Sequence, residues 1–519
     1  MPALPLSGQG GPTPPPSGAA PAPAGASAAS PGLTLGQALQ AALANGAAVQ
    51  LARQDVRTQQ GALTRAGGDF SPRFSTTVGT AWSEDPAAAA SAQPGQRTTR
   101  YQAGVTRQFR SGITVESGLN VTRLEQDAAL ANGAAATTPT LPVNTAGLSL
   151  RMDVPLWRDL GGGVTRAGER AARAELQGQS LALEQTVAAG AGDVAIAYWQ
   201  YVAAERRVDV YREAEARAER LSTELRALIA ADERPPADLN QALANLSAKR
   251  TSRIAAEQQV VEARQSLGRL MGLAATEVAT LPAPAADFPA AAPYAHDPAA
   301  VAAMAADALA ARRDLAAAGR RAQAAGVRLD AARDAGRPRV DLSVSHGYTG
   351  LASGGGLGSL VQPLYADRPG MSASVQVQLQ PAASAETRGL VQQQEAAAER
   401  ARIAERELRE AIASRVQAAS EALDRGVRVL AQARETAVLA ATTVENERRK
   451  NRVAANTLFE VIQAEDDLTG ARLSEVEAHL AHATALVRLR YESGALSGTG
   501  AAADLAALLA GTPTASTPR

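Results

Sequence analysis

The sequence contains no cysteine and few aromatic residues, and both deficits restrict the fold. Without cysteine, disulfides, thiolate metal sites and a lipid-modified N-terminal cysteine are excluded. Only 3% of the 519 residues are aromatic, which is too few large side chains for several compact globular cores. The abundant Ala, Leu, Glu, Gln and Arg instead favour long helices that pack closely against one another.

Charge of one sign and long apolar runs are also missing. The formal net charge is zero, so the chain has neither a basic surface for nucleic acid nor an acidic tail for a basic partner. No run of 18 apolar residues occurs, and no transmembrane helix is predicted. Residues 1–32 are rich in Pro, Gly, Ala and Ser and lack the features of a secretory signal. We predict that 1–32 and the tail 497–519 are disordered.

The sequence repeats itself at an offset of 222 residues. The stretch "DLNQALANL" (238–246) aligns with "EVIQAEDDL" (460–468), and the same offset pairs Gly272 with Gly494. One register held over roughly a hundred residues predicts an internal duplication. The predicted first repeat covers 33–272, with helices over 34–67, strands over 73–154, a long helix over 164–231 and a return helix over 237–271. A linker (273–299) leads to the second repeat, 300–496, with helices over 300–336, strands over 339–380, a long helix over 386–453 and a return helix over 458–493.

The two long helical patterns indicate an elongated molecule. Each has 68 residues without proline, and would extend about 100 Å as a helix. Helices of this length belong to coiled coils rather than to globular cores. The shorter helices of each half, placed end to end, are together nearly as long as the long helix. We therefore expect two short helices to pack along each long one. Gly272 and Gly494 stand where C-terminal cap glycines are expected.

Alternating segments between the helices predict strands with one apolar face. In "GLSLRMDV", Leu148, Leu150 and Met152 alternate with Arg151 and Asp153. Strands of about ten residues with this pattern fit a barrel wall between lipid and water, and a soluble sandwich is the alternative. The first half has 44 extra residues, in which two alternating runs flank "RSG". This pattern predicts an additional hairpin over 101–121, leaving four or six strands in each chain.

Several stretches, in this order, resemble the TolC-like outer-membrane efflux protein family. "LTLGQALQAALANG" is similar to its opening helix, and "LTRAGGDFSPRFS" and "LDAARDAGRPRVDLS" to its helix-to-strand junctions. "VPLWRDLGGGVTRAGERAARAEL" resembles a strand-to-helix junction of the family. The helix "DVAIAYWQYVAAERR" and the two "QA…L" stretches, in 238–246 and 460–468, are also similar to the family. The resemblance extends from about Leu33 to Leu496.

The resemblance implies a mixed α/β membrane protein that works as a homotrimer. Strands from three chains would close one outer-membrane β-barrel, continued by a long periplasmic α-helical barrel of coiled coils. The function implied is a passive exit duct of a tripartite efflux or type I secretion system. Its partners would be a periplasmic adaptor, an inner-membrane transporter and outer-membrane lipid, with no nucleic acid and no cofactor. The alternative is a soluble or periplasmic coiled-coil scaffold without channel activity.

No nucleophile with a plausible base is present, so we predict no enzyme activity and no catalytic or metal-binding residues. In the family, acids just after the tight turn between the second long helix and its return helix lie at the narrow end of the tunnel. The resemblance therefore implies a pore aperture at Glu460 and Gln463. The alternative for Glu460 is an ordinary acid at a helix N-terminus. Arg448, Arg449, Asp232 and Asp238 are candidate gate or tip contacts, or else solvated charges.

Three other acids and two histidines complete the candidate residues. Glu465, Asp466 and Asp467 follow Glu460 on the same helix and are interpreted as a solvated face. His479 and His482 have helical spacing, but two histidines and one neighbouring acid are a weak metal site. Tyr198, Trp199 and Tyr201 in "YWQY" are expected to pack between helices.

Overall fold

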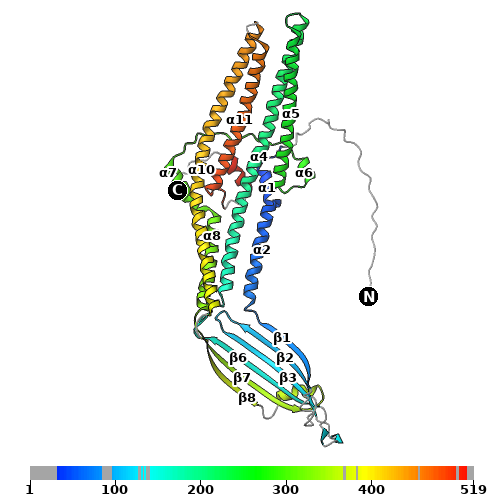
Figure 1. Ribbon diagram of the computed structural model, residues 1–519, viewed down its shortest axis with the longest axis vertical. Helices are drawn as coiled ribbons and strands as arrows, with labels where there is room; N and C mark the ends of the chain where they lie inside the picture. Colours follow the sequence, from blue (N-terminus) through cyan, green and yellow to red (C-terminus); the bar gives the residue numbers. More distant parts are fainter. Residues whose placement is uncertain are drawn as a thin grey trace, which may run out of the picture.

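The protein is elongated, with paired helices at one end and a curved sheet at the other (Figure 1). The computed structural model describes residues 32–83, 96–126, 130–131, 134–135, 141–365, 370–380, 384–453, 456–497 and 502–510. The predicted lead, 1–32, lies outside these residues except for Gly32. No described helix is both long and apolar enough to cross a membrane.

Helices make up most of the described chain. They are α1 (Leu35–Asn45), α2 (Ala47–Gly68), α4 (Ala167–Ala230), α5 (Pro236–Leu270), α6 (Ala275–Ala279), α7 (Pro298–Ala311), α8 (Arg313–Ala335), α9 (Gly358–Val361), α10 (Ala385–Arg452), α11 (Leu458–Glu492) and α12 (Ala502–Ala510), with a 3-10 helix η1 (Gln362–Tyr365). As expected from their lengths, α2 and α5 both pack along the long helix α4, while α8 and α11 pack along α10.

The return helices α5 and α11 each end at a glycine. Gly272 and Gly494 adopt φ values of 72° and 76°, a left-handed conformation that glycine enters without a Cβ clash. Leu273 N donates to Gly268 O at 3.0 Å, and Ala495 N donates to Arg490 O at 3.1 Å. These bonds close a Schellman motif at the end of α5 and of α11, as the sequence predicted.

The main sheet has six antiparallel strands in the order β1-β2-β3-β6-β7-β8. Its strands are β1 (Arg73–Ser83), β2 (Gln96–Gln108), β3 (Thr114–Gln126), β6 (Val143–Pro155), β7 (Arg339–Ser353) and β8 (Gly370–Gln380), and β4 (Leu130–Ala131) pairs separately with β5 (Ala134–Ala135). The predicted additional hairpin is confirmed, because β2 and β3 pair through a turn in which Gly112 has φ 90°. This hairpin raises the number of strands in the main sheet from four to six. Strands β1 and β8 lie at the two edges of the sheet.

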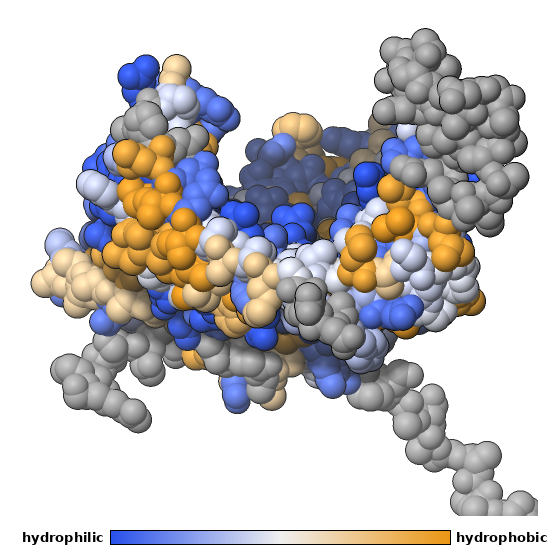
Figure 2. Space-filling model, turned by 90° about the horizontal axis from the view of Figure 1, so that it is seen from below, coloured by the Kyte–Doolittle hydropathy of each residue, from blue (hydrophilic) through white to orange (hydrophobic). Residues whose placement is uncertain are grey.

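The two faces of this sheet differ in polarity. Leu148 and Leu150 of β6 align with Tyr348 and His346 of β7, and the register places most of the large apolar residues of the six strands on one face. Many of them are exposed: Phe74, Val78, Trp82, Leu148, Leu150, Met152, Met371, Val375, Val377 and Leu379. Figure 2 shows hydrophobic residues gathered on the outer side of the curved sheet and hydrophilic residues in its hollow.

The largest core lies where the helices meet at mid-length. Tyr198, Trp199 and Tyr201 of α4 are almost fully buried there, as expected. The prediction of a disordered tail over 497–519 is wrong for α12, because Leu505 and Leu509 are fully buried in the same core against α1. These leucines are four residues apart and therefore share one helical face.

His482 of α11 is buried, and His479 on the same helix is half-buried. His479 stacks on Phe288 with ring centroids 5.2 Å apart, and His482 is 3% exposed. Among the described residues no group of His, Cys, Asp and Glu could hold a metal ion. Burial lowers the pKa of both histidines, and the Arg434 guanidinium, which lies 3.2 Å from His479 Nε2, lowers them further.

The lowered pKa values of His479 and His482 predict that the helical region loses stability in acid. A pKa below the ordinary 6.5 means that the unfolded chain binds more protons, so the free energy of unfolding falls as pH drops through 6.5 toward the folded-state pKa. Thermal unfolding midpoints measured between about pH 7.5 and about pH 5.5, on either side of the ordinary histidine pKa, should fall less in a His479→Gln/His482→Gln variant than in the parent. Equal falls in both proteins would contradict this prediction.

Candidate functional site

Helices α4 and α5 form one helical hairpin, and α10 and α11 form the other. The tips of these two hairpins contact each other at the end far from the sheet (Figure 1). Arg234, in the turn between α4 and α5, donates from Nη2 to the carbonyl oxygen of Asn451 at 2.9 Å. Asp232 in the same turn has φ 58°, a left-handed conformation that Asp tolerates better than most residues. Asp238 lies 3.9 Å from Arg234, so both predicted acids of this tip lie in or beside the turn.

Glu460 and Gln463 lie on the exposed side of α11, in its first turns. The Glu460 carboxylate accepts a hydrogen bond from Thr457 N at 2.8 Å and completes a capping box with Thr457. Gln463 Nε2 donates to Asp467 Oδ1 at 3.0 Å. Glu460 therefore stabilises the start of α11. A pore aperture needs copies from other chains, so that role stays a prediction.

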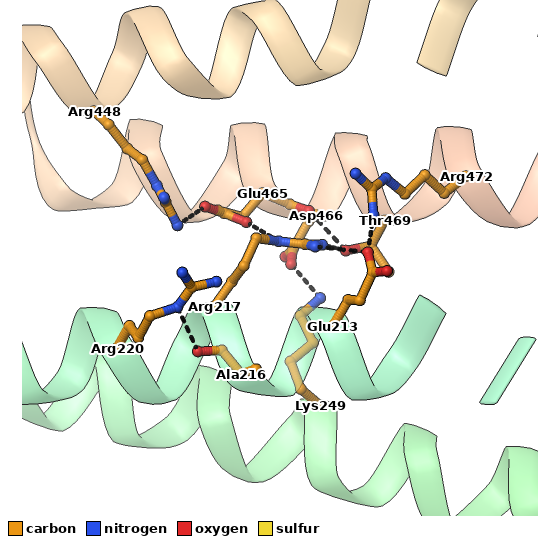
Figure 3. Close-up of polar contacts among 10 residues, drawn as sticks. All are labelled: Glu213, Ala216, Arg217, Arg220, Lys249, Arg448, Glu465, Asp466, Thr469 and Arg472. Carbon is orange, nitrogen blue, oxygen red and sulfur yellow. Dashed lines mark hydrogen bonds and ion pairs between the residues drawn. The ribbon is translucent and has the colours of Figure 1, made fainter. Parts of the chain in front are cut away.

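Glu465 is the centre of a buried ion cluster that joins the two hairpins (Figure 3). Its Oε2 accepts from Arg217 Nε of α4 at 2.7 Å, and Arg448 Nη2 of α10 lies 2.5 Å from its Oε1. Glu465 is 6% exposed, so its interpretation as part of a solvated face is wrong. The carboxylate pairs with two guanidiniums in a position where an unpaired charge would be costly.

Three further contacts extend this cluster between α4, α5 and α11. Arg217 Nη2 donates to Thr469 Oγ1 at 3.3 Å, Lys249 of α5 pairs with Asp466, and Arg472 pairs with Glu213 (Figure 3). Asp466 is thus half-buried and paired, which also corrects its assignment to a solvated face, whereas Asp467 is exposed. The cluster links one hairpin to the other by charge, beside a buried apolar cluster of Leu225, Ala242, Leu458 and Ile462 that joins the same three helices.

Of the two predicted gate arginines, only Arg448 lies in this cluster. Arg449 points away and pairs with Glu445 on its own helix at 3.2 Å. Sequence reasoning missed Arg217 and Glu465. Glu465 could have been found, because it stands at helical spacing within the buried stripe Leu458, Val461, Ile462, Leu468 and Thr469.

No family model matches this sequence, and no curated protein is similar to it in sequence. Solved structures do resemble it. The outer-membrane channel OprN aligns over 89% of this chain and 89% of its own, with 18% identity and a TM-score of 0.66. The CmeC outer membrane channel of Campylobacter jejuni aligns over 92% and 89%, with 13% identity and a TM-score of 0.67. The open state of the MtrE outer membrane channel of Neisseria gonorrhoeae aligns over 89% and 88%, with 14% identity and a TM-score of 0.64.

These alignments cover nearly the whole of both chains. The chain therefore has the fold of one subunit of these outer-membrane channels, which confirms the predicted combination of an antiparallel sheet with long helices. The trimer and the internal duplication stay predictions.

Proposed function

We propose that this chain is one subunit of a homotrimeric outer-membrane channel, which serves as a passive exit duct for substrates and has no catalysis of its own. The observation that carries the proposal is the curved six-stranded sheet, which is apolar outside, polar in its hollow and joined directly to long helical hairpins. Exposed apolar rows on a sheet are stable in lipid, and polar rows opposite them suit a water-filled lumen.

The open edges of the sheet support the trimer. Strands β1 and β8 have no further neighbour in one chain, and unpaired backbone groups are not tolerated in a bilayer. If β8 of each copy pairs with β1 of the next, three sheets of six strands give one barrel of eighteen. Barrels of about this size leave an aqueous channel.

The helical hairpins would continue the lumen through the periplasm toward an adaptor and an inner-membrane transporter. Tripartite efflux and type I secretion both use such a duct. The similarity to channels named OprN, CmeC and MtrE supports the channel role. We infer that the Arg217, Arg448 and Glu465 cluster holds the narrow end closed, while Asp232, Asp238 and Arg449 at the tips are available to partners.

Extraction and conductance test this proposal. The protein should sediment with outer membranes, require detergent for extraction, and migrate as a trimer that dissociates on heating. In planar bilayers it should give discrete conductance steps. A monodisperse elongated monomer in detergent-free buffer, without conductance, would instead establish the coiled-coil scaffold.

Glu460→Gln should reduce cation selectivity and weaken block by multivalent cations. Three Glu460 carboxylates around a narrow mouth would attract cations and repel anions. Glutamine keeps the capping box with Thr457 and removes only the charge, so trimer assembly should persist. Single-channel reversal potentials under a salt gradient measure the selectivity.

The matched control is Glu410→Gln, which removes one exposed carboxylate of α10 about 60 Å along the helix from its tip end. Equal effects of the two substitutions, or failure of cysteines at 460 to crosslink between chains, would place the aperture elsewhere.

A further inference from the structure

The segment 354–365, between β7 and β8, folds back over the apolar face of the sheet. A Cβ built on Gly350 would lie 1.7 Å from the carbonyl oxygen of Pro363, so glycine is required for this approach. Gly350 follows Tyr348 by two residues and shares its face, and the Tyr348 hydroxyl donates to Leu364 O at 2.9 Å. The segment therefore lies on the outside of the curved sheet and not in its hollow.

Specific polar contacts fix the segment in this place. Asn144 is fully buried and donates from Nδ2 to Gly354 O at 2.9 Å and to Ser359 Oγ at 3.0 Å. Arg123 Nη2 donates to Gly355 O at 3.0 Å. With Tyr348 at the other end, both ends of the segment are attached to strands. It packs chiefly on the inner strands β3, β6 and β7, away from the edges where neighbouring copies would add.

The surface that this segment presents is apolar. Residues 354–365, "GGGLGSLVQPLY", include no charged residue. Leu357, Val361 and Tyr365 are 84%, 51% and 82% exposed, so an apolar side chain reaches the surface at every fourth residue along α9 and η1. A loop that only met water would have no physical reason to expose this stripe.

The position of the segment 354–365 along the sheet matches the edge of a bilayer. The apolar face of β7 starts at Val340, and Gly350 lies ten residues farther on, at the end away from the helices. Ten residues extend about 33 Å along a strand, or about 25 Å of depth at a tilt of about 40°, which equals the apolar band of outer-membrane barrels. Trp82, 60% exposed near the same end of β1, is a residue type typical of the lipid–water boundary.

We propose that residues 354–365 are an interfacial anchor, which seats Leu357, Val361 and Tyr365 in the outer leaflet of the outer membrane and fixes the depth of the barrel. This rests on the proposed function, because it needs the sheet to span a membrane. The occupant of the apolar stripe is lipid at the acyl–headgroup boundary, where short uncharged segments with an aromatic side chain are stable.

Fluorescent labelling tests the anchor in trimers reconstituted into bilayers. Because the chain has no cysteine, Leu357→Cys and Val361→Cys each accept a single environment-sensitive fluorophore. Spin-labelled lipids with the quencher near the headgroup should reduce this emission more than lipids with the quencher at the acyl end. Leu150→Cys, in the middle of the apolar face, should show the reverse, and Ser149→Cys, its neighbour on the polar face, should respond only to aqueous iodide.

The controls separate the anchor from the channel proposal. If the label at 150 responds to lipid quenchers while the label at 357 responds to iodide as strongly as that at 149, the anchor is wrong and the channel stands. If neither lipid nor iodide reaches the label at 357, protein covers the stripe and the anchor is also wrong. If the label at 150 is insensitive to every lipid quencher, the sheet does not span the bilayer and both proposals fail.

Discussion

Replacing Glu465 by leucine is expected to lower the free energy of unfolding by about 3–5 kcal/mol, because it removes the buried carboxylate that pairs with Arg217. The Arg217 guanidinium then keeps only the exposed Glu213 carboxylate, 3.7 Å away. Arg448, about one third exposed, also loses its partner but is able to turn toward water. The two hairpins should separate near their tips, so the thermal midpoint should fall. In the proposed channel, single-channel conductance should rise.

Two variants show whether burial of the charge is the cause. Glu213→Leu removes an exposed acid of the same cluster and should cost about 1 kcal/mol or less. Replacing Arg217 and Glu465 together by leucine removes both buried charges and should recover most of the stability. A double variant as unstable as Glu465→Leu would mean that shape, not charge, holds the hairpins together.

Arg312→Leu is the second substitution with a large expected effect. Arg312, between α7 and α8, is 2% exposed, pairs with Asp314 at 2.6 Å and with Glu492 at the end of α11, and lies over the Tyr491 ring at 5.1 Å. Burial lowers its pKa, but hydrogen bonds and charge from Asp314 and Glu492 outweigh this and raise the pKa above its usual range. Removing the guanidinium leaves two shielded carboxylates unpaired, at a cost of about 3–5 kcal/mol.

The neighbouring arginine provides the control for this substitution. Arg313 is 40% exposed in its side chain and pairs with Glu184 at 3.0 Å, so Arg313→Leu should cost about 1 kcal/mol or less. Urea unfolding followed by far-UV circular dichroism compares the two variants. Similar midpoints for both would show that the buried network around Arg312 adds no more than a surface pair.

Much of the architecture could be derived from the sequence, because it depends on local patterns. The absence of proline over 68 residues permits the long helices, and Gly272 and Gly494 end the return helices through the left-handed conformation. The period of two in "GLSLRMDV" specifies a two-faced strand, and "RSG" between two such runs specifies the extra hairpin. The 222-residue duplication and the aperture at Glu460 stay predictions.

The tertiary structure alone decided where charges and short apolar stretches go. Glu465 and Asp467 are two residues apart on one helix, yet only Glu465 meets α4 and α10, because the partner helices cover one side of α11. The short stretch "LAALLA" becomes a helix because α1 offers a core to bury Leu505 and Leu509. Likewise, the period of the strands gives no information about which face the segment 354–365 covers. That choice depends on Asn144, which is 210 residues from Gly354 and supplies a hydrogen bond to it. It also depends on the pairing of β7 that places Gly350, which has room for Pro363, on the same face of the sheet as Asn144.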